Sequence, residues 1–523
     1  MKSEYIFAFF TAILFSLAFP PFKYGFLAYW ALVPFFYLLE GKNLKSSFYW
    51  GYVTGLLISL GTIYWISFVT LPGAIATLLI HPLYFSLYAM LHSFVRERLK
   101  ERYVLAIPFI WTGIEYLKSL GELGFPWVSL GYTQSHYIYL IQYASYTSVF
   151  GVTFWVVMIN VLIYLILKNI ENRRKVVIYL STILVLIITP WVYGKLVVPE
   201  EKNFEDALTV GLIQGNIDPF MKWKKENIEM SFAKYDRLSR EAAKYHPDLL
   251  IWPETATPTY LLHNRQNFMR VKNLVQELNI PLVTGTPDYI FITRNEYKTF
   301  NSAVLITPGS SFIPKYDKMH LVPFGERVPY EDAIPFFKDF IQSLEMGEGN
   351  FSPGKKIVLF PLKQIHPATN HEFNQNTGFE RTIQLATVIC FESIFPDLVQ
   401  KFVAKGAQLL IVITNDGWFG RAHFPWWLNG GLYQHARMSV FRAIENRISI
   451  ARCANTGVSM FIDPYGRVLK QSAIFKDEYL VAPVTLRSTS TFFTRNGNVF
   501  SRGVSLVGLF FIFFAGVLKR HAG

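Results

Sequence analysis

The stretch Val388-Ile389-Cys390-Phe391-Glu392-Ser393 ends an apolar run with a cysteine, just before a helix expected to begin near Phe395. A thiolate is stabilised near a helix N-terminus, so a cysteine in this place is suited to act as a nucleophile. A buried structural cysteine is the ordinary alternative, because a lone cysteine usually belongs to a core. The choice between them depends on what the rest of the chain supplies.

Two further motifs place a charged side chain at or beside an apolar strand. Glu254 follows the apolar run 249–252, and Lys318 stands in a strand-like stretch among apolar neighbours. Taken singly, the glutamate could cap the next helix and the lysine could lie along an exposed edge. Taken with Cys390, they supply the base and the cation that a thiol nucleophile needs. We therefore expect Glu254 to deprotonate Cys390, while Lys318 and the backbone N–H of Phe391 stabilise an oxyanion.

Strands and helices alternate on both sides of these motifs. Strands are expected at about 207–217, 248–252, 281–286, 299–307, 312–317, 384–390 and 408–414, and helices at about 226–245, 264–278, 396–405 and 431–447. This alternation, with antiparallel pairs mixed in, predicts a layered α/β domain. The polar segment 363–382 has the composition of a surface insertion.

Long apolar runs flank this domain. The 523 residues are 51% hydrophobic and 17% aromatic, and the apolar residues gather before about Thr189 and after about Gly503. A membrane-spanning helix needs roughly 20 mostly apolar residues. Eight spans are expected, at about 4–22, 24–40, 47–69, 73–94, 103–117, 149–167, 176–197 and 499–518. We expect a seven-helix membrane domain over 1–198, a catalytic domain over 199–490, and a final span with a cytoplasmic tail over 491–523.

The basic residues of the short loops gather in alternate loops. Counted from an inner N-terminus, the inner loops hold the basic clusters 42–45, 96–102 and 168–175, whereas the short outer loops hold only Lys23 and Lys118. This asymmetry predicts that both termini are cytoplasmic and that the catalytic domain faces outward. The same clusters account for much of the net charge of +13, so we expect no nucleic-acid partner.

The chain has two cysteines, Cys390 and Cys453, which excludes a disulfide framework. A bridge between them would disable the nucleophile. We therefore expect Cys390 to be free and Cys453 to be a core thiol.

Large aromatic residues also gather in turn-rich segments. The stretches Pro219–Trp223, Phe336–Phe340 and Trp418–Trp427 are expected to dip into the outer leaflet and admit acyl chains, with burial in the core as the alternative. The aromatic loop that contains Trp127 has two interpretations, an interfacial belt or the wall of a lipid-accessible groove.

The ordered set of Glu254, Lys318 and Cys390 at strand ends resembles the nitrilase superfamily. The runs Gln214–Ile217, Leu321–Pro329 and Thr414–Gly420, with the flanking spans, are similar to the apolipoprotein N-acyltransferase family. That resemblance implies an α-β-β-α sandwich on the outer face of the cytoplasmic membrane. We also expect a monomer without metal or cofactor. It also implies a phospholipid acyl donor and a diacylglyceryl lipoprotein whose N-terminal amine is the acceptor.

The resemblance also assigns supporting residues. Glu326 is expected to orient Lys318, and Glu392 matches a carboxylate beside the nucleophile. Phe391 departs from the tyrosine that the family often has there, although the backbone N–H remains. Trp223 is implied to contact lipid. With Trp418 and Trp127, it makes up the set of expected substrate-binding residues.

Two other function classes fit parts of this pattern. A membrane-tethered amidase would use the same three residues with water as the acceptor, but it would need neither eight spans nor apolar loops. A transport or scaffold protein would not need an intact Glu-Lys-Cys set, and the few charges within the spans disfavour an ion path.

Overall fold

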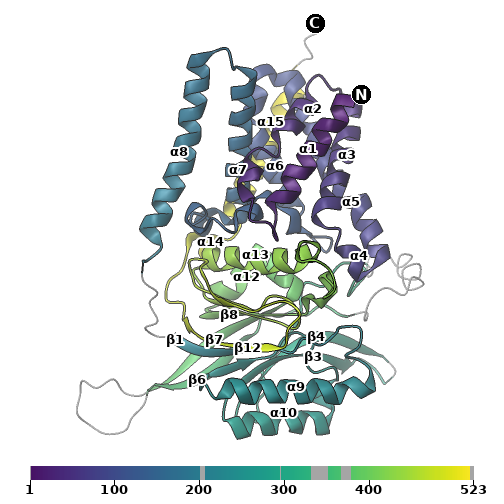
Figure 1. Ribbon diagram of the computed structural model, residues 1–523, viewed down its shortest axis with the longest axis vertical. Helices are drawn as coiled ribbons and strands as arrows, with labels where there is room; N and C mark the ends of the chain where they lie inside the picture. Colours follow the sequence, from purple (N-terminus) through teal and green to yellow (C-terminus); the bar gives the residue numbers. More distant parts are fainter. Residues whose placement is uncertain (1, 201–206, 295, 331–350, 367–378, 519–523) are drawn as a thin grey trace, which may run out of the picture.

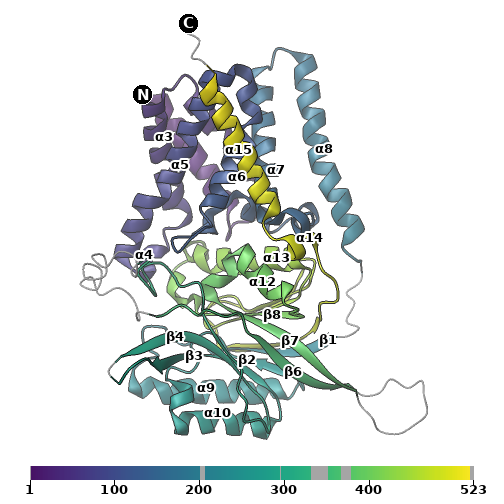
Figure 2. The same cartoon turned by 180° about the vertical axis from the view of Figure 1, so that it is seen from behind.

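The computed structural model describes residues 2–200, 207–294, 296–330, 351–366 and 379–518. A bundle of apolar helices forms one end of the molecule and a sandwich of two sheets forms the other (Figure 1). The start of helix α1 and the end of helix α15 both lie at the end of the bundle far from the sandwich (Figure 2).

The sandwich contains two six-stranded sheets. The first has the order β12-β1-β2-β3-β4-β5 and the second β11-β10-β9-β8-β7-β6. The strands are β1 (Ala207–Gln214), β2 (Leu249–Ile251), β3 (Leu282–Phe291), β4 (Tyr297–Ile306), β5 (Lys315–Asp317), β6 (Leu359–His366), β7 (Phe379–Ile389), β8 (Leu409–Thr414), β9 (Ile450–Ala454), β10 (Met460–Ile462), β11 (Val468–Gln471) and β12 (Glu478–Thr485).

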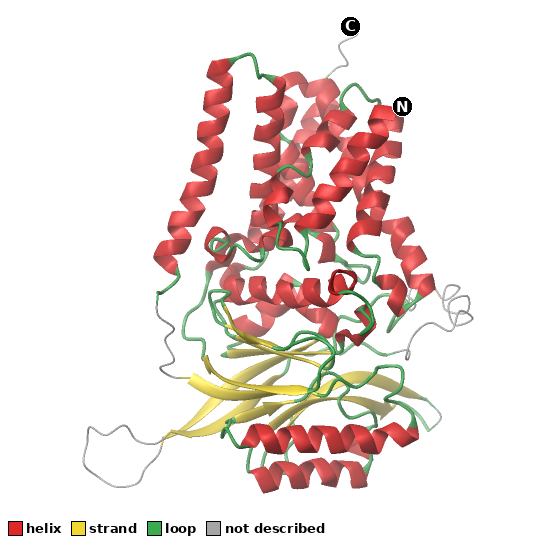
Figure 3. Cartoon of the chain, in the orientation of Figure 1, coloured by secondary structure: helices red, strands yellow, loops and turns green. Residues whose placement is uncertain are grey.

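Helices cover the outer face of each sheet. The helices α9 (Lys225–Ala243) and α10 (Arg265–Leu278) cover the first sheet, while α12 (Pro396–Ala404) and α13 (Gly430–Asn446) lie between the second sheet and the bundle (Figure 3). These four layers confirm the predicted α-β-β-α fold class.

The centre of each sheet is parallel, and its strands are apolar on both faces. In the second sheet β7, β8 and β9 run parallel, and all six residues of β8 are buried. In the first sheet β1, β2 and β3 run parallel. Parallel strands that are covered on both faces have continuous apolar sequences. Polar residues that follow the carboxyl ends of such strands lie together at one edge of the sheet.

Both ends of segment 363–382, which the sequence predicts to be a surface insertion, are strands. Lys363 pairs with Thr382 and His366 with Phe379, so these ends extend the antiparallel β6–β7 pair. Polar side chains are compatible with such a strand pair, because a hairpin that projects beyond a sheet has no core to face. Residues 367–378 lie outside the described part of the chain.

The bundle contains a helix in each of the predicted spans. The helices are α1 (Lys2–Ala18), α2 (Val33–Leu39), α3 (Leu44–Thr62), α4 (Ile66–Val69), α5 (Leu71–Leu99), α6 (Ile107–Leu117), α7 (Ala144–Lys168), α8 (Arg173–Val197), α14 (Phe492–Asn496) and α15 (Val499–Val517). Within the described residues, four helical segments are long and apolar enough to cross a bilayer: 71–105, 144–168, 173–197 and 499–517. The second predicted span is divided between a short 3-10 turn and α2, and α6 has only 11 residues.

The segment between α6 and α7 packs between the bundle and the sandwich. Its Trp127 is 1% exposed, and the indole Nε1 donates to Gln434 Oε1 of α13 at 2.8 Å. Trp65, just before α4, donates to the same oxygen at 3.2 Å. Trp127 therefore does not belong to an interfacial belt, because its ring is packed between the two parts of the molecule.

Candidate active site

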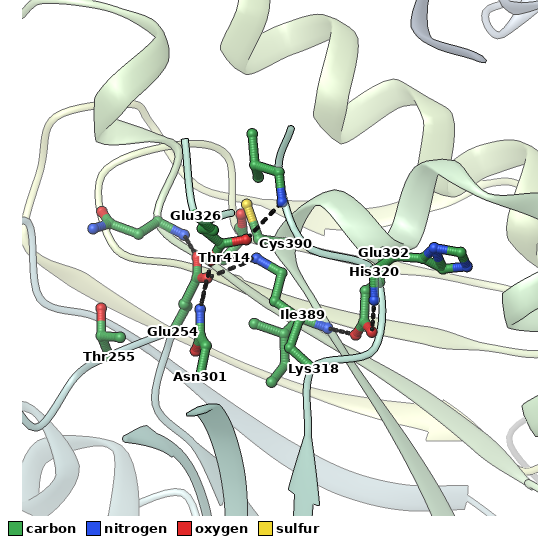
Figure 4. Close-up of polar contacts among 12 residues, drawn as sticks. Glu254, Thr255, Asn301, Lys318, His320, Glu326, Ile389, Cys390, Glu392 and Thr414 are labelled. Carbon is green, nitrogen blue, oxygen red and sulfur yellow. Dashed lines mark hydrogen bonds and ion pairs between the residues drawn. The ribbon is translucent and has the colours of Figure 1, made fainter. Parts of the chain in front are cut away.

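Three strands end at one point between the two sheets. Glu254 follows β2, Lys318 follows β5 and Cys390 follows β7, and their side chains point toward one another (Figure 4). All three are buried, with exposures of 6%, 0% and 5%. The structure thus brings together residues that are separated by up to 136 positions in the sequence.

Lys318 is held between two carboxylates. Its Nζ donates to Glu326 Oε1 at 2.9 Å and to Glu254 Oε1 at 3.4 Å. Asn301 Nδ2 donates to the same two oxygens, at 3.0 and 2.8 Å. Burial alone would lower the pKa of Lys318, but Glu326 and Glu254 together raise it above its ordinary value. The side chain is therefore a fixed ammonium.

The second oxygen of Glu254 is held by backbone. Asn415 N, at the end of β8, donates to Glu254 Oε2 at 2.9 Å. A Cβ at Gly285 would come within 2.7 Å of the Glu254 Cα and the Thr255 N, so only glycine allows β3 to approach this turn. Glu254 is thus fixed in place by three separate strands.

Cys390 occupies a tight turn. Its φ is +52°, a left-handed conformation that costs a non-glycine residue on the order of 1–3 kcal/mol and is common at functional sites. A 3-10 turn (Cys390–Ile394) separates it from α12, which begins at Pro396. The expected thiolate stabilisation by the helix is not found. Burial raises the pKa of the thiol and Glu254 raises it further, outweighing Lys318, so the resting group is a neutral thiol.

Glu392 ties the nucleophile turn to the chain beyond Lys318. Its Oε1 accepts hydrogen bonds from the Tyr316 hydroxyl (2.6 Å), Met319 N (2.6 Å) and His320 N (3.2 Å), and its Oε2 accepts from Ile389 N (2.8 Å). The side chain is fully buried. Because both carboxylate oxygens of Glu392 already accept hydrogen bonds from neighbouring groups, this residue holds the strand ends in position.

A buried polar network supports the other side of Cys390. His435 Nε2 lies 3.1 Å from the carbonyl oxygen of Cys390, and His435 Nδ1 lies 2.8 Å from Asp416 Oδ1. Arg452 Nη2 donates to Asp416 Oδ2 at 2.6 Å. Although burial opposes it, Arg452 and His435 hold the pKa of Asp416 well below its ordinary value.

The ligand atoms of Cys390, Asp416 and His435 lie within 4.8 Å of one another, a spacing that a metal ion could bridge. The guanidinium of Arg452 contacts both Asp416 and His435, at 2.6 and 3.1 Å. It places a positive charge beside the two groups that would have to bind a cation. The arrangement therefore fits a hydrogen-bonded support better than a metal centre.

Several of these partners carry little signal in the sequence. Asn301 lies within β4, where an asparagine carries no motif, and His435 and Arg452 lie in α13 and β9, more than 40 positions from Cys390. Asn415 directly follows the apolar strand β8, as Cys390 directly follows β7.

The expected substrate-binding tryptophans lie in three different settings. Trp223 is 37% exposed, and Trp418 is partly buried against Phe220, with ring centroids 4.7 Å apart. Trp127 lies behind the site, with its ring 5.1 Å from that of His435. Trp427 is 48% exposed and borders an apolar groove of about 860 Å³ between α1 and α3. Residues Phe336–Phe340 lie outside the described part of the chain.

A second hollow adjoins the nucleophile turn. It has a volume of about 250 Å³ and is lined by Met319, His320, Phe391 and Phe395 of the sandwich, together with Glu122 from the segment after α6. Phe391 is 5% exposed, and its ring stacks on Phe125 at 6.3 Å. The hollow gives an apolar reactant room beside the nucleophile turn.

Cys453 is a core residue, as expected. It is fully buried, and its Sγ donates to the carbonyl oxygens of Ile213 (3.4 Å) and Ile251 (3.2 Å). Both cysteines are free thiols.

Comparison with known proteins extends over both parts of the chain. Residues 11–162 match the apolipoprotein N-acyltransferase N-terminal domain, and residues 209–492 match the carbon-nitrogen hydrolase family. The apolipoprotein N-acyltransferase of Geobacter metallireducens is 35% identical over 516 residues, covering 96% of this chain and 93% of that protein. That of Chlorobaculum tepidum is 34% identical over 487 residues, covering 90% and 87%.

Among solved structures, a mutant of the Nesterenkonia AN1 amidase from the nitrilase superfamily is 17% identical, with a TM-score of 0.38, and covers 58% of this chain and 99% of that one. The match to carbon-nitrogen hydrolases concerns the sandwich alone, whereas the match to the acyltransferases also includes the helices that precede it. Because the likeness runs through both parts of the molecule, the chain belongs to the apolipoprotein N-acyltransferase family.

Proposed function

We propose that this enzyme transfers a fatty acyl chain from a phospholipid, through a thioester on Cys390, to the N-terminal amine of a diacylglyceryl apolipoprotein. The observation that carries the proposal is the convergence of Glu254, Lys318 and Cys390 in one buried site. Membership of the acyltransferase family supplies the class of reaction. The chemistry needs no cofactor, because a base, a cation and a thiol suffice for acyl transfer.

In the first half-reaction Glu254 takes the proton of the Cys390 thiol, and the sulfur attacks the ester carbonyl of the phospholipid. The raised pKa of the thiol makes this base necessary. The developing oxyanion is stabilised by the Lys318 ammonium and the backbone N–H of Phe391. The carbon–oxygen bond of the ester then breaks, Glu254 returns the proton to the leaving oxygen, and a lysophospholipid departs.

In the second half-reaction the α-amine of the lipoprotein attacks the thioester carbonyl. Glu254 accepts a proton from the attacking nitrogen, and the oxyanion forms beside Lys318 again. The carbon–sulfur bond breaks, the proton passes to the sulfur, and the amide product leaves Cys390 as a thiol. Glu326 keeps Lys318 in position through the 2.9 Å hydrogen bond during both steps.

The proposed setting is the outer face of the cytoplasmic membrane, with both termini in the cytoplasm. The distribution of basic loop residues supports this orientation. It is also supported by the start of α1 and the end of α15, which lie together at the end of the bundle opposite the sandwich. We propose the domain limits 1–198, 199–490 and 491–523, and a monomer without a nucleic-acid partner. Reporter fusions after Lys42, Lys175 and Ser488 would test the orientation.

The exposed aromatic loops are proposed to admit acyl chains from the leaflet. Trp427 is exposed and Trp418 contacts the loop of Phe220, which is itself 51% exposed. Changing both tryptophans to Ser is expected to weaken acyl transfer while the thiol stays reactive. Unchanged transfer would count against a lipid role for these loops.

The central test is a mass measurement on the Cys390 peptide after the purified protein has been mixed with phospholipid and trapped. We expect the mass of one acyl chain to be added in the wild type and to be absent in Cys390→Ala and Glu254→Gln. Cys453→Ala is the matched control, since Cys453 is a buried thiol with no part in the reaction. Hydrolysis of a small amide without any acyl-enzyme would favour the amidase alternative.

A further inference from the structure

A separate hollow on the side of the sandwich is lined by residues that take no part in the proposed acyl transfer. Its volume is about 320 Å³, and it is lined by Pro199, by the β10–β11 turn with Tyr465, and by the residues that follow β12. Helix α13 separates it from the nucleophile, because His435 lies beside Cys390 while Arg447 follows the other end of the helix. Twelve residues of α-helix span about 18 Å.

The charged lining of this hollow is strongly unbalanced. In the part of the chain that the structure describes, it contains the guanidinium groups of Arg447, Arg467 and Arg487 and one carboxylate, Asp463. That carboxylate is taken by Arg467, whose Nε donates to Asp463 Oδ2 at 2.5 Å. Within the described residues, neither Arg447 nor Arg487 makes an ion pair.

Among the described residues, Arg447 and Arg487 donate hydrogen bonds to neutral groups, and the carboxylate of Asp463 also attracts Arg447 electrostatically. Arg447 Nη1 donates to Gln142 Oε1 at 2.6 Å, and its guanidinium lies 4.8 Å from the centre of the Tyr465 ring. Arg467 approaches the same ring at 6.0 Å, so two cations share one aromatic neighbour. Arg487 Nη1 reaches only the carbonyl of Val403 at 3.5 Å, and its Nε is buried without a hydrogen-bond partner among the described residues.

Because Arg447 and Arg487 are partly buried, their positive charges are unfavourable unless a partner compensates them. Burial lowers the pKa of Arg447, although Asp463 acts in the opposite direction, and burial lowers the pKa of Arg487. A guanidinium stays protonated, so both positive charges remain at the hollow. Planar N–H pairs of this kind match the oxygens of a phosphate group.

The hollow lies where the sandwich meets the membrane helices. Pro199 comes two residues after α8, and Gln142 comes two residues before α7; both helices are long and apolar enough to cross a bilayer. Gln142 also donates to the carbonyl of Tyr465 at 2.9 Å, and this hydrogen bond joins the lining to the N-terminal end of α7. The outer ends of membrane-spanning helices lie at the level of the lipid headgroups.

We propose that this hollow binds the phosphate of an anionic phospholipid, held by Arg447 and Arg487. The phosphodiester oxygens accept hydrogen bonds from the two guanidinium groups, and the hydroxyls of Ser488 and Thr489 in the same lining are further donors. The acyl chains extend beside α7 and α8. The bound lipid fixes the sandwich to the membrane at a point remote from Cys390, so it is neither the acyl donor nor the acceptor.

The test is a titration of the full-length, delipidated protein in detergent with phosphatidylglycerol, followed by native mass spectrometry of the one-to-one lipid adduct. The double variant Arg447→Gln and Arg487→Gln is compared with the wild type. Removing two charge-assisted contacts is expected to weaken the apparent Kd at least about tenfold. Arg237→Gln is the matched control, because Arg237 is an exposed arginine of α9 at the far side of the sandwich, and it should leave the Kd unchanged.

Equal phosphatidylglycerol binding by the double variant and the wild type would overturn the proposal. If the double variant does not fold, the single variants Arg487→Lys and Arg487→Gln are compared instead. Arg487→Lys keeps the charge, so it is expected to lose less lipid affinity than Arg487→Gln. Unchanged affinity in both variants would overturn the site. Inorganic phosphate is titrated in parallel. Binding of phosphate alone, with the same dependence on the two arginines and no lipid binding, would refute a lipid ligand.

Discussion

Glu326 offers the sharpest test of how Lys318 is controlled. Its Oε1 receives both the Lys318 ammonium at 2.9 Å and the Asn301 amide at 3.0 Å, while its Oε2 receives Val322 N at 2.8 Å. Glu326→Gln keeps the shape but replaces one oxygen by an NH₂ group. Whichever way the amide is turned, one N–H faces another donor.

The expected cost follows from these contacts. A hydrogen bond between charged groups contributes about 1.5–3 kcal/mol, more than a neutral one. Lys318 is fully buried, so water cannot replace the lost carboxylate, and the ammonium turns toward Glu254, now 3.4 Å away. The Glu254 carboxylate is then paired more closely with the Lys318 ammonium, and this pairing hinders Glu254 from accepting the proton of Cys390. A loss of about 1.5–3 kcal/mol of transition-state stabilisation slows acyl-enzyme formation about 10- to 150-fold.

Single-turnover formation of the Cys390 thioester, followed by mass, measures this effect directly. Glu229→Gln is the control, because its side chain is 70% exposed and, among the residues that the structure describes, pairs with Arg270 alone. A rate for Glu326→Gln within about twofold of the wild type would refute the reasoning, since a difference of 1.36 kcal/mol already changes a rate tenfold. Thermal unfolding of the same samples separates a slower reaction from a damaged fold.

Four other predictions test the triad and its surroundings. Asn301→Asp places a third carboxylate against the two that hold Lys318 and should slow thioester formation at least about tenfold, because like charges in contact disfavour the ionised pair; a wild-type rate would contradict this. Asp416→Asn leaves Arg452 buried without its carboxylate and should destabilise the protein by about 3–5 kcal/mol, seen as a lower thermal midpoint. Because the pKa of Asp416 is held below its ordinary value of 3.8, its contribution to stability is present above about pH 4 and is lost as the pH falls further; the thermal midpoint is therefore expected to fall less steeply with pH in Asp416→Asn than in the wild type, and equal slopes would contradict this. Since burial raises the pKa of Cys390, its labelling by a thiol reagent should be slow at pH 7 and should still be rising at pH 10, and a plateau near pH 7 would show a stabilised thiolate instead.

The nucleophile and the base could be proposed from the sequence because each comes at or just after the end of a short apolar run, whereas Lys318 was suggested by its strand-like stretch among apolar neighbours. A buried parallel strand has a recognisable composition, and a polar residue directly after it lies at the carboxyl edge of the sheet. This local rule applies to Glu254 and Cys390 in the same way. It also applies to Asn415, which directly follows the apolar strand β8.

Residues that act across the sandwich gave no comparable signal. Asn301 joins Glu254 to Glu326, and Arg452 neutralises Asp416, through contacts between strands that are not adjacent in sequence. The lowered pKa of Asp416 and the raised pKa of Cys390 depend on burial and on which charges face the group, and neither can be read from a motif.

The sequence alone determined the class of the molecule: apolar helices around an α/β domain, and a thiol, a carboxylate and an ammonium at its strand ends. These follow from periodicity and composition, which are local properties of the chain. Only the tertiary structure decided that Trp127 is packed between the two parts of the molecule, that the ends of segment 363–382 pair as strands, and that Cys390 rests as a protonated thiol. Each of these depends on which distant residues exclude water from a group or pair with it, and that is a property of the packed chain.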